Sequence, residues 1–326
     1  MKKILGIGNA LVDIMTLLED DTHLQHINLP KGSMQLVEKD DSDRLLSLSS
    51  HLTMSKASGG SAANTIRGIA NLGLETGYIG KIGNDDFGKF FYDDLKATSA
   101  TPHLLTSPVT DTGRALAFVS KDTERTFATY LGAAVEMIPE DLNDAVFSHY
   151  DFLHIEGYLL FNHDLIIRAL ELAKKHNLMV ALDLASYNVV EANRDFLNDI
   201  INRFVDIVFA NEEEAKAFAN AEPEEALHKI AEMVDISVVK LGKNGSLVKA
   251  RNEVYKAGII EASAVDTTGA GDLYAGGFLY GLAHKKTLDQ CARYGAVLSG
   301  KVVETIGAKI ADEVWNTIRT EVSHAK

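Results

Sequence analysis

The sequence has only one cysteine, Cys291, in 326 residues. A single thiol cannot form an intramolecular disulfide or supply a multi-cysteine zinc site. The eleven histidines show no HExxH or similar ligand spacing, which argues against a zinc site built from them. We therefore expect a reducing, cytoplasmic environment.

The chain also lacks an uninterrupted apolar run long enough to span a bilayer. Its first fifteen residues begin with lysines and apolar residues, as a signal peptide does. However, Asn9 and Asp13 interrupt that run, and no small-residue cleavage site follows. We interpret Lys3–Gly8 as a buried first strand and predict no membrane partner.

Positive charge is scarce. Lys and Arg number 32 and Asp and Glu number 46, so the formal net charge is −14. Phosphate backbones and anionic lipids repel so acidic a chain, which argues against a nucleic-acid or membrane partner. A small anionic ligand is still compatible, because a few backbone N–H groups aimed at it can outweigh a diffuse negative field. We therefore expect a small-molecule partner.

Two common nucleotide-binding patterns are missing: the GxxxxGK[ST] P-loop and the GxGxxG dinucleotide fingerprint. What the chain does contain, from about residue 150 onward, is a regular alternation of apolar runs and amphipathic segments. The runs are 151–155, 179–184, 205–210 and 237–241. Continuous apolar strands between amphipathic helices predict a parallel sheet covered on both faces, with ligands at the carboxyl ends of its strands.

The first third of the chain has a different pattern. Ser33–Glu38 alternates as a strand does, and Arg114–Ser120 with Thr126–Leu131 is typical of a hairpin. We predict a small second sheet from strands near 14–39 and 106–131, acting either as a cover over a ligand cleft or as a simple edge extension. No Pro/Gly-rich linker or repeat divides residues 1–326, so we expect a single domain.

Asp266-Thr-Thr-Gly-Ala-Gly-Asp272 is the most informative segment, because it precedes a strongly apolar helical pattern. Gly269 and Gly271 allow a tight turn that presents backbone N–H groups at a helix N-terminus, where negative charge is favoured. Such a turn suits a phosphoryl group in transfer. Asp272 would be either a helix cap or a base that takes a proton from a hydroxyl group.

A second glycine pair, Gly59-Gly60, opens another amphipathic helix that carries Asn64. It is either a plain tight turn or a place where a polyhydroxylated ligand approaches the backbone. Asn9 and Asp13 add an amide and a carboxylate after the first strand, a combination that suits the hydroxyl groups of a sugar.

Two further segments lie at the favoured end of the predicted sheet. Asn211 and Glu214 begin a helix, where acidic residues either complement the helix dipole or arrange water around Mg²⁺. Lys240, Gly242 and Gly245 form a turn between strands, which is either an ordinary hairpin or a backbone approach to a nucleotide.

Together these segments resemble the ribokinase/PfkB family of ATP-dependent small-molecule kinases over nearly the whole chain. Gly59-Gly60 with Asn64 is similar to the N-terminal signature of that family. The segment 266–272 with Ala275-Gly-Gly-Phe278 is similar to its C-terminal signature, and Asn211 to Glu214 to its NxxE motif. The resemblance implies a ribokinase-like, three-layer Rossmann-like α/β domain with a mainly parallel sheet and a small β-sheet lid.

The same resemblance implies transfer of the γ-phosphoryl group of ATP to a hydroxyl group, usually a primary one, with Mg²⁺ and, in many members, K⁺. It implies that Asp272 is the catalytic base and that Arg125 and Asp183 lie near the phosphates. The other implied roles are an anion hole (Gly269, Ala270, Gly271), sugar binding (Asn9, Asp13, Gly59, Gly60, Asn64), ATP binding (Asn211, Glu214, Lys240, Gly242, Gly245), a water-mediated Mg²⁺ contact (Glu214) and a K⁺ site (Asp266, Thr268, Gly307).

Two branches of the family, which differ in the acceptor that they phosphorylate, both fit the sequence. Gly8-Asn9 to Asp13, the segment 204–211 and Gly157-Tyr158 resemble adenosine kinases, in which Tyr158 would stack on a purine. Met34–Glu38 holds no clear copy of their base-contacting residues. We favour adenosine, with a free sugar such as ribose or fructose as the alternative and a non-catalytic binding module as a remote one. The resemblance is compatible with a monomer or a homodimer.

Overall fold

The computed structural model describes residues 2–122 and 124–324. Its larger sheet has nine strands: β1 (Ile4–Ile7), β5 (Thr76–Gly83), β6 (Thr101–Ser107), β9 (Phe152–Glu156), β10 (Met179–Asp183), β11 (Ile207–Asn211), β12 (Ile236–Lys240), β13 (Ser246–Ala250) and β14 (Glu253–Ala257). Their order is β14-β13-β12-β11-β10-β9-β1-β5-β6. All neighbouring pairs from β12 to β6 are parallel, and β13 is antiparallel to both β12 and β14. The predicted parallel sheet is confirmed.

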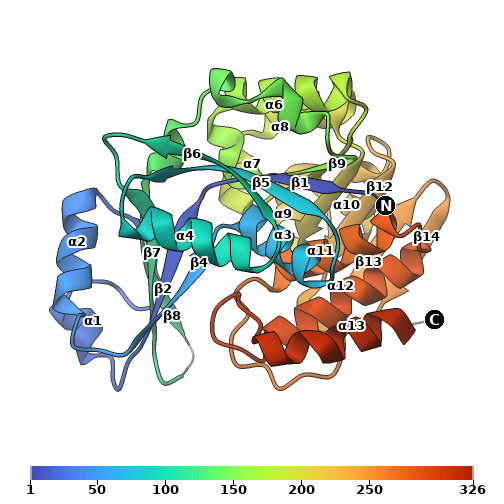
Figure 1. Cartoon of the computed structure of the whole chain (residues 1–326). Coiled ribbons are helices and arrows are strands. Elements are labelled where there is room, and N and C mark those ends of the chain that lie inside the picture. The colour runs from blue at the N-terminus through green and yellow to red at the C-terminus, as the bar shows by residue number, and fades with distance from the viewer. Residues whose placement is uncertain (1, 123, 325–326) are drawn as a thin grey trace.

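Helices cover both faces of this sheet, which gives three layers (Figure 1). On one face lie α3 (Ser61–Asn71), α4 (Asp86–Ala97), α11 (Ala270–Ala283) and α12 (Leu288–Val302). On the other lie α6 (His163–Lys175), α7 (Tyr187–Ala192), α8 (Arg194–Phe204), α9 (Glu212–Ala219) and α10 (Pro223–Ile230). The remaining pieces near this sheet are α5 (Asp144–Phe147), α13 (Trp315–His324) and the short 3₁₀ helices η1 (Ala133–Glu136), η2 (Pro139–Asp141), η3 (Gly157–Phe161), η4 (Gly242–Asn244) and η5 (Asp312–Val314).

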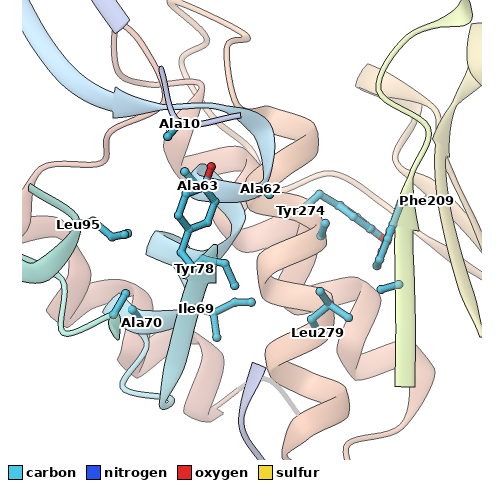
Figure 2. Packing of buried hydrophobic residues seen from close by; sticks show 14 of the residues in the cluster. Ala10, Ala62, Ala63, Ile69, Ala70, Tyr78, Leu95, Phe209, Tyr274 and Leu279 are labelled. Carbon is cyan, nitrogen blue, oxygen red and sulfur yellow. The ribbon is translucent and has the colours of Figure 1, made fainter. Parts of the chain in front are cut away.

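The continuous apolar strands follow from this two-sided burial. In β1, Ile4 belongs to the cluster beneath α3, whereas Leu5 and Ile7 belong to the cluster beneath α6 and α8. Successive side chains of a strand point to opposite faces, so a strand buried on both faces must be apolar at every position. Figure 2 shows the first cluster, in which Tyr78 packs near the alanines of α3 and Phe209 near Tyr274.

A second, five-stranded sheet stands beside the main domain, with α1 (Thr22–His26) and α2 (Lys39–Leu48) on its outer side (Figure 1). Its order is β3 (Met34–Leu36), β8 (Arg125–Gly132), β7 (Thr112–Val119), β2 (Leu11–Leu17) and β4 (Met54–Gly59). The predicted hairpin is present, because β7 and β8 pair antiparallel. One detail differs, because β4 was not expected. Asp13, which follows the first strand as predicted, lies inside β2.

No helix within residues 2–122 and 124–324 is both long and apolar enough to cross a membrane.

Candidate active site

Asp272 lies in the first turn of α11, where the N-termini of α11 and α3 meet. Its carboxylate accepts two hydrogen bonds, from Ser61 Oγ to Oδ1 at 2.8 Å and from Asn64 Nδ2 to Oδ2 at 2.9 Å. The N-cap of α11 is Gly269, so Asp272 is not the cap of this helix. Loss of solvation raises the pKa of Asp272 to about 6, while the hydrogen bond from Asn64 opposes that rise. A carboxylate with this pKa is mostly ionised at neutral pH and can accept a proton.

The glycine turn before Asp272 has the conformation that the sequence predicted. Gly269 adopts a left-handed backbone with φ of 74°, and a Cβ there would overlap Ala308. The N–H of Ala270 donates to the carbonyl of Thr267 at 3.2 Å, so it is engaged within the turn. Among the described residues, the N–H of Gly271 has no acceptor. The turn therefore offers a free donor at a helix N-terminus, where anions bind well.

Lys240 supplies the positive charge beside this turn. It ends β12, and a Cβ placed on Gly271 would lie 3.1 Å from its Nζ. Its Nζ also lies 2.8 Å from Oδ2 of Asp183, at the end of β10. Attraction to Lys240 lowers the pKa of Asp183 despite its burial, and attraction to Asp183 raises the pKa of Lys240. Both groups are therefore charged, at the carboxyl ends of two strands that flank β11.

Asn211 and Glu214 form a reciprocal capping box at the start of α9. Glu214 N donates to Asn211 Oδ1 at 2.8 Å, and Asn211 N donates back to Glu214 Oε2 at 2.8 Å. The pair thus caps the N-terminus of α9, an interaction that was not predicted from the sequence. Glu214 is nevertheless buried, and loss of solvation raises its pKa to about 7. Lys240 is the buried cation that faces both Glu214 and Asp183, so an additional cation near them, such as hydrated Mg²⁺, fits this charge balance.

A cleft of about 350 Å³ separates the small sheet from the loop after α12. Its lining includes Asp13 and Met15 of β2, Ala57 of β4, the loop residue Gly307 and Asp312 of η5. The carboxylate of Asp13 has no hydrogen-bond partner among the described residues. Loss of solvation raises its pKa to about 7. A partly buried carboxylate without a protein partner at the wall of a cleft can accept hydrogen bonds from a ligand.

The glycine pair at the end of β4 brings the backbone close to two other segments. A Cβ on Gly59 would overlap the carboxylate of Asp13. Gly60 has φ of 97°, and a Cβ there would overlap the carbonyl oxygen of Asn9. Glycine is therefore required at position 60, a side chain at position 59 would displace the carboxylate of Asp13, and the pair sets the junction between the small sheet and α3.

Glu156 is a site residue that we did not predict. Its Oε1 accepts hydrogen bonds from Asn9 N at 3.1 Å and Asn9 Nδ2 at 2.8 Å, and its Oε2 accepts one from Ala62 N at 3.0 Å. Loss of solvation raises its pKa to about 7. The signal in the sequence is an acidic residue at the carboxyl end of an apolar strand. Asn9, predicted to hold a sugar, thus directs its side-chain amide at Glu156.

Arg125 reaches from β8 of the small sheet to the loop before α11. Its Nη1 lies 2.9 Å from Asp266 Oδ1 and also contacts Thr268 Oγ1, and its Nη2 donates to Thr267 Oγ1 at 3.1 Å. Asp266 also accepts from the N–H of Thr268 at 2.9 Å and of Gly307 at 2.8 Å. The three residues predicted for a K⁺ site therefore lie together, with the guanidinium group of Arg125 against their carboxylate.

The remaining predicted residues flank this region. Tyr158 lies in η3 with 38% of its surface exposed, and partial loss of solvation of its hydroxyl together with repulsion from Glu156 raises its pKa to about 12. Gly242 and Gly245 form the turn between β12 and β13, with Leu241 N donating to Gly245 O at 2.7 Å. That geometry is an ordinary hairpin turn directly after Lys240.

The fold and this cluster define an α/β kinase of small molecules. The pfkB family carbohydrate kinase profile matches residues 32–315, and the chain belongs to this family of ATP-dependent phosphotransferases. It is similar to an adenosine kinase structure from Sinorhizobium meliloti (34% identity, 100% and 99% of the two chains covered, TM-score 0.87). A probable sugar kinase structure from Rhizobium etli is also similar (33% identity, 98% of each chain, TM-score 0.88). A 5-dehydro-2-deoxygluconokinase of Bacillus licheniformis is 29% identical, with 77% of this chain and 82% of the relative covered.

Proposed function

We propose that this kinase transfers the γ-phosphoryl group of ATP to the primary hydroxyl of a ribonucleoside, with adenosine as the favoured acceptor. Asp272 acts as the general base that takes the proton from that hydroxyl as the new P–O bond forms and ADP leaves. The observation that carries this role is the position of its ionised carboxylate, at the helix N-terminus that holds the free N–H of Gly271.

The other residues position the reactants. Asp13 accepts hydrogen bonds from hydroxyl groups of the acceptor, because its carboxylate has no other partner in the described structure. The N–H of Gly271 and the Nζ of Lys240 stabilise negative charge on the phosphoryl oxygens. Glu214 and Asp183 fit a hydrated Mg²⁺, which neutralises charge on ATP when bound. The small sheet acts as a lid that excludes water, since water also accepts phosphoryl groups.

A nucleoside suits the inner face of the small sheet, which is largely apolar. Met15 and Phe127 pack together there with Ala117 and Val119. Met34 pairs with Phe127, and its side chain is 66% exposed. The apolar side chains of the small sheet suit a purine, and the polar side chains near Asp272 suit the ribose joined to it, with Tyr158 as the residue that stacks on the base. The similarity to the S. meliloti adenosine kinase supports the same acceptor.

An anionic free sugar is the alternative acceptor. Lys56 and Lys309 contribute to the lining of the cleft, and relatives at 28–29% identity are 5-dehydro-2-deoxygluconokinases. Lys309, however, is paired with Asp94 at 2.6 Å, so part of this positive charge is already neutralised.

ADP release over a panel of nucleosides, pentoses, hexoses and sugar acids tests the proposal. We expect the highest kcat/KM with adenosine and a product phosphorylated on its primary hydroxyl, identified by ³¹P NMR. Higher kcat/KM with a free sugar than with any nucleoside would reject the nucleoside assignment. If the protein binds ATP but phosphorylates none of the acceptors in the panel, the catalytic role of Asp272 is rejected.

A further inference from the structure

Two side chains on the first turn of α3 hold the carboxylate of Asp272. Ser61 Oγ donates to Oδ1 and Asn64 Nδ2 donates to Oδ2. Asn64 belongs to the predicted sugar-binding set, yet its amide nitrogen points to Asp272. No role was predicted from the sequence for Ser61, which lies between Gly60 and Asn64. Each carboxylate oxygen thus has one donor from the same helix turn, which restrains rotation of the carboxylate about its Cβ–Cγ bond.

Close packing of α3 against α11 holds these donors in place. Thr65 Oγ1 donates to the backbone carbonyl of Asp272 at 3.0 Å. A Cβ on Gly276 would lie 3.1 Å from the carbonyl oxygen of Thr65, and one on Gly68 would lie 2.7 Å from the side chain of Leu273. Small residues on both helices therefore allow close contact between them. Both helices also contribute buried residues to the same core cluster, which fixes their relative position.

We propose that Ser61 is a positioning residue for phosphoryl transfer. Its hydroxyl fixes the orientation of the Asp272 carboxylate and stabilises its ionised form, and Asn64 does the same from the other oxygen. This inference rests on the proposed role of Asp272 as the base. A carboxylate has about four acceptor positions, so positions remain for the primary hydroxyl of the acceptor while Ser61 and Asn64 stay bound.

The charges around Asp272 show why donors are needed. Most charged groups that face it are carboxylates, which disfavour a further negative charge, and Lys240 opposes them. The groups are Asp13 on β2, Glu156 on β9, Asp183 on β10, Glu214 on α9 and Lys240 on β12, with the neutral Tyr158 on η3. Hydrogen bonds from neutral donors lower the pKa without adding charge, so losing one should shift protonation of Asp272 to higher pH.

The test compares Ser61→Ala, Ser61→Thr and Thr65→Val by steady-state kinetics from pH 5 to pH 9. Thr65→Val is the matched control, because it removes a hydroxyl on the same helix that contacts only backbone carbonyls, those of Ser61 and Asp272, and not the carboxylate of Asp272. For Ser61→Ala we expect kcat to fall by about tenfold, KM for ATP to change by less than about threefold, and the acid limb of kcat to move up by roughly half to one pH unit. Ser61→Thr should restore most of the loss.

Two outcomes would overturn the inference: an acid limb of Ser61→Ala that coincides with wild type, or a Thr65→Val variant that shows the same loss and shift. Thermal unfolding of each variant separates a folding defect from a positioning effect, because a folding defect lowers the active fraction without moving the pH profile. Asp272→Asn distinguishes the two proposals. If that variant is fully active, the base assignment fails; if it is inactive while Ser61→Ala matches wild type, only the role of Ser61 fails.

Discussion

Lys240 and Asp183 form an ion pair in which Nζ and Oδ2 are 2.8 Å apart and the side chains are only 15% and 5% exposed. The pair joins the carboxyl ends of β12 and β10, two strands separated in the sheet by β11. Asp183 thereby holds a lysine ammonium next to Gly271, at the N-terminus of α11. A fixed cation needs no reorganisation when negative charge develops on a phosphoryl group.

Replacing that cation should impair both binding and turnover of ATP. We expect Lys240→Met to raise KM for ATP and to lower kcat by about 10²-fold, the scale of removing one electrostatic contact to a transition state. Lys240→Arg should retain more activity because it keeps the charge. Lys243→Met, an exposed change in the same hairpin, is the control. Steady-state kinetics with ATP as the varied substrate measures the effect, and a KM and kcat equal to those of Lys243→Met would contradict it.

Asp272→Asn should leave substrate binding nearly intact and lower kcat by ~10²–10⁴, the range for losing a general base. The amide preserves the size of the side chain but cannot take the proton. Calorimetric titration with the acceptor and with ATP checks binding, and single-turnover kinetics checks chemistry. A rate within a few-fold of wild type would show that the carboxylate is not the base.

Removal of K⁺ should lower activity if the loop at Asp266 holds this ion in the active state. We expect kcat in potassium chloride to exceed kcat in choline chloride at equal ionic strength. Arg125 contacts the carboxylate of Asp266, so Arg125→Ala should reduce the K⁺ concentration needed for half-activation. Identical rates in both salts, for wild type and variant alike, would show that this loop does not hold a K⁺ ion that the reaction needs.

Replacing Gly60, at the junction with α3, by alanine should destabilise the protein more than replacing another glycine of similar backbone conformation. Gly60 and Gly73 have φ of 97° and 92°, but a Cβ on Gly73 would meet nothing within 4 Å. Both Ala variants incur about 1 kcal/mol of backbone strain. Gly60→Ala should cost about 1–3 kcal/mol more, because the new Cβ overlaps the carbonyl of Asn9. Urea unfolding of both variants measures the difference, and equal free energies of unfolding would contradict the expectation.

Asp13 should make stability depend on pH. Its pKa is about 7 in the folded chain and 3.8 for the free side chain. A pKa raised by folding contributes stability that is present below pH 4 and is lost as the pH rises through 7. Asp13→Asn cannot ionise, so it should gain stability relative to wild type between pH 5 and pH 8, by about 2 kcal/mol. Chemical unfolding at both pH values tests this; a constant difference between the two proteins would refute it.

The main sheet was predictable because its strands are buried on both faces and are therefore apolar throughout. Strand 205–210 and the helix that starts after Asn211 were located from that pattern alone, and the structure has them as β11 and α9. The strand Met54–Gly59 escaped detection because Lys56 and Ser55 are exposed in it, and its apolar content is low. This segment is a strand because its backbone pairs with β2, and not because its side chains alternate between apolar and polar.

The candidate site was predictable in its residue types but not in its partners. Asp272 and the glycine turn were found because backbone conformation and charge at a helix start leave a local signal. The contacts of Asn64 and Asn9 to Asp272 and Glu156 join residues 208 and 147 positions apart. No local pattern can reveal such contacts, and the one local signal of Glu156, an acidic residue at the end of an apolar strand, does not show which residues it binds.

The inner face of the small sheet has a consequence for the behaviour of the protein in solution. Met34 and Leu36 are 66% and 71% exposed, which would favour adhesion between molecules. The formal charge of −14 opposes that adhesion through mutual repulsion of the molecules. Repulsion weakens as salt is added, so the unliganded protein should remain dispersed in dilute buffer and begin to self-associate as ionic strength rises.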